Sequence, residues 1–199
     1  MRKSSVYILS AVMVGMVLAS VHPVLASSTE AKIASLTQEI KSHPDSEQAL
    51  IGRAVAYIDN GEFINALADL NNAISLNPGS SQAYTLRGVA YEHLTDFNRS
   101  IIDYGTAIKL DSKNAEALYR RGQIYLMKGN AKSAIEDFTA AINVNPNYAP
   151  AYALRALAYT NIGEYDKSAR DCKRALEIDP KGRWGELAKF ELEFLATKK

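Results

Sequence analysis

Residues 115–148 read AEALYRRGQIYLMKGNAKSAIEDFTAAINVNPNY. Apolar residues recur at helical spacing from 117 to 128 and again from 131 to 144, and Gly129-Asn130 separates the two runs. Asn145-Pro146 ends the second run, because proline disfavours helical backbone in the residue before it. This stretch therefore predicts two short helices joined by a tight turn.

The same pattern recurs every 34 residues. Four sets of identical residues follow this spacing: Arg53, Arg87, Arg121 and Arg155; Tyr57, Tyr91, Tyr125 and Tyr159; Asp69, Asp103, Asp137 and Asp171; Ala73, Ala107, Ala141 and Ala175. Prolines share a further register at 44, 78, 146 and 180, in which Ser112 takes the remaining place. Registers that repeat together indicate a stack of similar units, and we expect Ser112 to loosen the turn between the second and third units.

The repeating unit resembles the tetratricopeptide repeat (TPR) over about residues 47–182. In the third unit the matching positions are Leu118, Gly122, Tyr125, Ala134, Phe138, Ala141 and Pro146. The resemblance implies an all-α, right-handed superhelical solenoid of four helical hairpins, at 47–80, 81–114, 115–148 and 149–182. Ser100 and Ser168 depart from the family pattern, which has Ala there, by a small-for-small exchange.

The segments beside the repeats have the pattern of capping helices. Residues 27–44 form a degenerate half-repeat, with Ile33, Leu36 and Ile40 in register with a second helix. Residues 183–199 contain an amphipathic helix, predicted over 186–197, whose apolar face carries Leu187, Phe190, Phe194 and Leu195. We expect it to cover the last hairpin of the stack.

Residues 1–26 have the order of a secretory signal peptide. Arg2-Lys3 precedes an apolar run, and Val24 and Ala26 stand at the small-residue positions before a cleavage point at Ser27. The alternative is an uncleaved membrane anchor, although 16 interrupted apolar residues from 6 to 21 are short for a span. We therefore expect an exported protein without a membrane span after processing. The resemblance favours the periplasm, with secretion or membrane anchoring as alternatives.

The composition argues against several classes of function. The net charge is +1 over the whole chain, so no basic field indicates nucleic acid. The single cysteine, Cys172, excludes an intrachain disulfide and occupies the packing register of Phe138. Metal-ligand spacing, a nucleophile motif and a phosphate-binding loop are all missing from the sequence. We predict no enzyme activity, no cofactor and no metal.

The recurring Arg and Asp stand 16 residues apart, one on each helix of a hairpin. We predict four structural ion pairs, because buried charges are normally paired: Arg53/Asp69, Arg87/Asp103, Arg121/Asp137 and Arg155/Asp171. An anion site at the Arg-Gly pairs of the second and third units is the alternative.

The resemblance implies that the first helices line a concave groove. The candidate groove residues are Tyr119, Gln123, Leu126, Met127, Glu92, His93, Ile58 and Asn161, with Tyr119, Leu126 and Met127 as a binding hot spot. The clamp by which chaperone-binding relatives hold a terminal carboxylate is not matched, since only Arg120 fits it. We predict a non-catalytic scaffold in the cell envelope that binds a protein or peptide segment. The alternative is a membrane-tethered scaffold or complex subunit that uses its convex face. The oligomeric state stays open.

Overall fold

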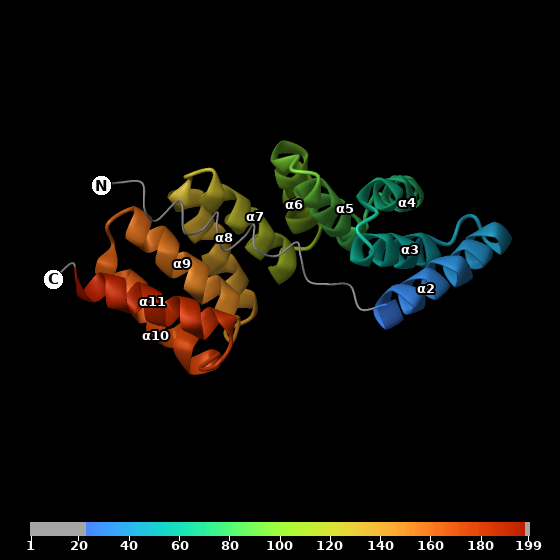
Figure 1. The fold of residues 1–199 in the computed structure, drawn as a ribbon. Coiled ribbons are helices and arrows are strands. Elements are labelled where there is room, and N and C mark those ends of the chain that lie inside the picture. Colours follow the sequence, from blue (N-terminus) through green and yellow to red (C-terminus); the bar gives the residue numbers. More distant parts are fainter. Residues whose placement is uncertain (1–22, 198–199) are drawn as a thin grey trace. The chain divides into compact units, whose positions relative to one another are not determined.

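The computed structural model describes residues 23–197, and this part of the chain contains ten α-helices and no strand (Figure 1). The helices are α2 (Pro23–Ser42), α3 (Glu47–Asp59), α4 (Phe63–Leu76), α5 (Ser81–His93), α6 (Phe97–Leu110), α7 (Ala115–Met127), α8 (Ala131–Val144), α9 (Ala149–Asn161), α10 (Tyr165–Ile178) and α11 (Arg183–Ala196). The prediction of an all-α helical repeat is confirmed. The basic start and apolar run of the predicted leader lie outside the described residues. Among residues 23–197, no helix is long and apolar enough to cross a membrane.

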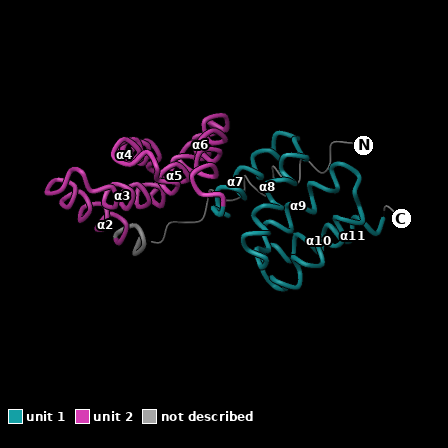
Figure 2. The backbone as a smooth tube through the Cα atoms, turned by 180° about the vertical axis from the view of Figure 1, so that it is seen from behind, with its two compact units in different colours: residues 1–15, 113–199 teal, residues 16–112 magenta. Residues whose placement is uncertain are grey.

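The chain divides into two compact units, and the boundary falls between Ser112 and Lys113 (Figure 2). One unit contains α2 to α6, and the other contains α7 to α11. The division coincides with Ser112, the residue that interrupts the proline register.

Each repeat is an antiparallel hairpin with a tight turn. Gly61, Gly129 and Gly163 have φ values of 77°, 77° and 81°, a left-handed conformation that glycine adopts without a steric penalty. In the second hairpin Thr95 takes the same place with φ 61°. The first helices of the first three hairpins are N-capped by Ser46, Ser80 and Asn114, whose side chains accept a hydrogen bond from the backbone N–H three residues later.

The two helices of a hairpin approach most closely at one small residue. A Cβ atom added to Gly88 would lie 2.6 Å from the ring of Tyr104, and one added to Gly122 would lie 2.8 Å from the ring of Phe138. The other two hairpins have alanine at this position, and there the facing residues are Leu70 and Cys172. Glycine thus stands opposite an aromatic ring, and alanine opposite a smaller side chain.

Both flanking helices differ from their predictions. Helix α2 begins at Pro23, ahead of the predicted segment, with Ile33, Leu36 and Ile40 half-buried.

Helix α11 packs on α10 and α9, and Leu187 and Leu195 of the predicted face point inward as expected. Its inward residues are Trp184, Leu187, Ala188, Glu191, Leu192 and Leu195. Phe190 was wrongly assigned to this face: it is 52% exposed, because the buried spacing runs through 188, 191 and 195 and leaves 190 on the opposite side.

Candidate functional site

All four predicted Arg–Asp pairs are formed, each with two hydrogen bonds. In each pair the Arg Nε and Nη2 atoms donate to the two carboxylate oxygens over 2.7–2.9 Å. The aspartates are buried and the arginines are half-buried. The hydrogen bond to Asp137 raises the pKa of Arg121, so the charged form is the favoured one. These cations are occupied inside their own hairpins.

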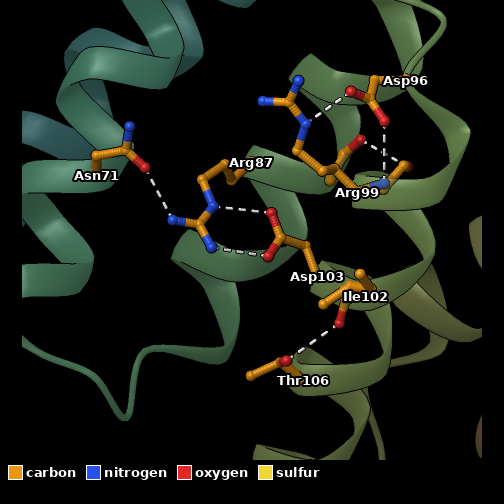
Figure 3. Close-up of polar contacts among 9 residues, drawn as sticks. Asn71, Arg87, Asp96, Arg99, Ile102, Asp103 and Thr106 are labelled. Atoms are coloured by element: carbon orange, nitrogen blue, oxygen red, sulfur yellow. Dashed lines mark hydrogen bonds and ion pairs between the residues drawn. The ribbon is translucent and has the colours of Figure 1, made fainter.

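Three of the arginines make a second hydrogen bond that the sequence pattern did not predict. The Nη1 atom of Arg87 donates to Asn71 of the preceding helix over 2.8 Å (Figure 3). Arg53 and Arg155 reach Thr37 and Thr139 in the same way, over 3.1 Å and 2.9 Å. These acceptors follow the 34-residue spacing, so the sequence contained a signal for the second hydrogen bond. The remaining position of this register, 105, is glycine and offers no side-chain acceptor to Arg121.

Three of the four recurring tyrosines lie against the guanidinium groups of these pairs. Arg53, Arg121 and Arg155 lie 5.8, 5.8 and 5.9 Å from the ring centroids of the tyrosines four residues later. Cation–π contacts of this kind add to the ion pairs. The recurring Arg, Asp and Tyr residues therefore stabilise the hairpins.

The candidate groove residues of the unit α2–α6 are Ile58, Glu92 and His93. Ile58 is half-buried, and Glu92 accepts a hydrogen bond from the Tyr104 hydroxyl over 2.7 Å. His93 is exposed, and its ring stacks on Phe63 with 4.5 Å between centroids and 6° between planes. This unit thus presents a stacked ring pair, Phe63 and His93, of which His93 is exposed.

The candidate groove residues of the unit α7–α11 are not all accessible. Tyr119 is 8% exposed and Leu126 is 4% exposed, so these two members of the proposed hot spot are packing residues. Gln123 and Met127 are half-buried and Asn161 is exposed. Of the three predicted anchors, only Met127 retains surface for a partner.

Tyr119 is buried by rings that come from three other helices or turns. Its centroid lies 5.1 Å from Tyr148, 6.1 Å from Phe138 and 6.4 Å from Trp184, which meets it edge-on. Burial raises the pKa of both Tyr119 and Tyr148 above the ordinary tyrosine range. Trp184 belongs to α11, outside the repeats, so the repeat pattern gave no warning of this contact.

Cys172 is fully buried beneath α11, as expected for a packing position. It lies in a cluster with Ala153, Ala156, Ala175 and Ala188. Burial raises the pKa of its thiol to about 12, so it is protonated at neutral pH and a poor nucleophile. Within residues 23–197, no group of three His, Cys, Asp or Glu side chains is placed to hold a metal ion.

An open groove runs beside the C-terminal half of α11. It has a volume of about 840 Å³, and its lining includes Tyr165, Arg170, Lys173, Leu192 and Leu195. The lining mixes charges of both signs with apolar side chains, so it defines no single ligand chemistry.

Family models match most of the repeat region. The model described as tetratricopeptide repeat matches residues 115–148 and 149–181, a TPR repeat model matches 96–129, and another tetratricopeptide repeat model matches 51–105. These matches extend over more than half of the chain. No curated protein matches the sequence.

Solved structures with the same fold include MamA, at 27% identity and a TM-score of 0.71, covering 78% of this chain and 91% of that one. YrrB, described as a TPR protein with an unusual peptide-binding site, is 19% identical with a TM-score of 0.68 and coverages of 80% and 82%. The first TPR of Spaghetti (RPAP3), solved with an HSP90 peptide, is 21% identical with a TM-score of 0.56 and coverages of 59% and 91%.

Proposed function

Since the chain belongs to the tetratricopeptide repeat family, we propose that it is a non-catalytic scaffold that binds a protein or peptide segment on the first helices of its repeats. The observation that carries this proposal is that the recurring residues and the variable residues of the repeat occupy different environments. The residues that recur are satisfied inside the hairpins, as Arg121 is by Asp137. The exposed positions that vary from unit to unit, such as His93 and Asn161, are the ones left to distinguish a partner.

Two structural neighbours support a peptide ligand. YrrB has a peptide-binding site, and the Spaghetti repeat was solved with a peptide. A terminal carboxylate is not the ligand we propose here, because the one matching cation, Arg120, forms an ion pair with Glu116. We propose an apolar or aromatic segment instead, and each unit is considered by itself: the candidate contact is Met127 on α7 in one unit and His93 on α5, whose ring stacks on Phe63, in the other.

The proposed location is the cell envelope, with the periplasm as first choice. The basis is the leader pattern of Arg2-Lys3, an apolar run and Val24-Leu25-Ala26.

A photo-crosslinking amino acid placed singly at Met127 or His93 tests the groove. We expect both positions to capture the same partner in the native compartment, and expect positions on the second helices to stay uncrosslinked. Matched controls are Ile64 and Ile102, which lie on α4 and α6 and are 67% and 65% exposed.

The same controls test the second candidate, a scaffold that uses its convex face. Large aliphatic side chains exposed to this extent on second helices favour that alternative. Crosslinks from Ile64 and Ile102, with none from Met127 and His93, would replace the groove proposal by the convex-face one.

A further inference from the structure

Helix α11 covers the last hairpin with an apolar face that contains one acidic residue. Glu191 is only 6% exposed, and the other inward positions of the helix include Ala188 and Leu195. A carboxyl group in such a place is costly when ionised, because it has lost the water that stabilises its charge.

The carboxyl group faces a small polar pocket in the last repeat. Its Oε1 atom lies 2.5 Å from the Thr160 hydroxyl of α9, which lies 2.9 Å from the Ser168 hydroxyl of α10. In the preceding hairpin, Leu126 stands in the place of Thr160 and Phe138 in the place of Cys172. Smaller and more polar side chains thus make room for Glu191 in the last repeat.

Nothing in the described part of the chain neutralises an ionised Glu191 by an ion pair. Cys172 of α10 carries a neutral thiol, and Asp171 of α10 is held by Arg155 of α9. Arg170 and Lys173 of α10 are exposed and line the neighbouring open groove. Burial raises the pKa of Glu191, and the hydrogen bond with Thr160 opposes that rise.

The hydroxyl chain accommodates both protonation states. A threonine hydroxyl has one hydrogen and can accept as well as donate. When Glu191 is neutral, its own O–H donates to Thr160, and Thr160 donates to Ser168. When Glu191 is ionised, Thr160 donates to the carboxylate and the direction of the chain reverses.

We propose that Glu191 makes the docking of α11 pH-dependent, so that the helix is held in its neutral form and loosened in its ionised form. Loosening would uncover Cys172 and withdraw Trp184 from Tyr119. The cap is then a device that exposes an aromatic first-helix surface as pH rises. This inference does not depend on which partner the scaffold binds.

The sign follows from proton linkage. Because docking raises the pKa of Glu191, the docked state binds the proton more tightly than the undocked one. The full docking free energy is present below the ordinary carboxyl pKa of 4.5. The docking free energy decreases as pH rises from 4.5 to the docked-state pKa of Glu191, and it stays constant at higher pH.

Labelling of Cys172 with dithiodipyridine, a thiol reagent active in acid, measures the opening directly. Glu191→Gln keeps the shape and removes the charge, so the ratio of wild-type to variant labelling rates cancels the pH dependence of the thiol itself. We expect this ratio to rise as pH increases above 4.5 and to level off above the docked-state pKa, after a total rise of about tenfold for each pKa unit by which docking raises Glu191. Emission of Trp184, the single tryptophan, should shift to the red over the same range in the wild type only.

Two further variants separate cap opening from general unfolding. Ala141→Cys with Cys172→Ala places the thiol in α8, away from the cap, and its labelling rate should lack the extra pH dependence. Thr160→Val removes the hydrogen bond that opposes the rise in the Glu191 pKa. The increase in the Cys172 labelling ratio should therefore extend to higher pH. A flat ratio for Cys172, or an equal rise for the thiol transferred to α8, would overturn the proposal.

Discussion

Gly122 of α7 lies directly against the ring of Phe138 in α8, so that an added Cβ atom would come within 2.8 Å of ring atom Cε1. Neither residue has room to yield, since both are buried in the hairpin core. We expect Gly122→Ala to destabilise the protein by about 1–3 kcal/mol through overpacking, even though alanine is the better helix former. Urea denaturation followed by circular dichroism measures the change.

Gly52 is the matched control for this substitution. It also lies inside a first helix, but its added Cβ would meet Leu36 at 3.5 Å, an ordinary contact. Gly52→Ala should therefore stabilise by up to about 1 kcal/mol. In the Gly122→Ala background, Phe138→Leu should recover part of the lost stability, because Ala54 and Leu70 already form that combination. Equal effects of the two glycine substitutions would contradict the close-approach argument.

The Arg121–Asp137 pair should show strong coupling. Asp137 is buried and accepts both hydrogen bonds from Arg121, so removal of one partner strands a buried charge. Arg121→Leu, which leaves the buried carboxylate alone, should cost about 3–5 kcal/mol. A double-mutant cycle with Asp137→Leu measures the coupling energy. Near-zero coupling would return Arg121 to consideration as an anion contact.

The corrected face of α11 gives a second matched pair. Leu195 is buried and Phe190 is exposed. Leu195→Ala should cost about 2–5 kcal/mol, whereas Phe190→Ala should stay within about 0.5 kcal/mol of the wild type. Thermal unfolding of both variants tests the placement of Phe190, because Leu195 belongs to the predicted and the observed face alike, and a large loss at Phe190 would return that residue to the docking face.

Truncation after Gly182 removes the whole of α11 and uncovers the cluster around Cys172. We expect the shortened chain to aggregate or to melt at lower temperature, because a repeat stack needs a polar outer face at its end. Size-exclusion chromatography and a melting curve measure this. A soluble truncation with an unchanged melting temperature would show that the helix is dispensable.

The leader prediction concerns the covalent chain. Val24 and Ala26 follow the apolar run, so the mature protein should begin at Ser27. N-terminal sequencing of protein taken from the export compartment checks the position. A chain that still begins at Met1 would favour the uncleaved, tethered alternative.

The 34-residue spacing was sufficient for the repeated part of the fold. It assigned Arg121 and Asp137 to facing helices, and the structure joins them by two hydrogen bonds, because residues in one register meet the same surroundings in every unit. The prediction of helix α8 over residues 131–144 agrees with the structure for the same reason.

The contacts that the 34-residue spacing could not predict are made by α11, which lies outside the repeats. The burial of Tyr119 depends partly on Trp184, and the polar pocket of the last repeat is completed by Glu191. A short amphipathic helix can dock through overlapping faces, and only the partner surface selects between one that buries Phe190 and one that buries Glu191. Tyr119 and Leu126 were mistaken for groove anchors for the same reason, since a groove position can be occupied by the chain itself.

The second bonds of the arginines have a direction along the chain. Arg53, Arg87 and Arg155 each donate to an acceptor in the helix that precedes their own hairpin: Thr37, Asn71 and Thr139. When the polypeptide emerges from its amino end, each of these acceptors is therefore already present before its donor arrives. Each of these three hairpins can therefore form its second hydrogen bond with a helix that has already been synthesised, which suits folding in the order of synthesis.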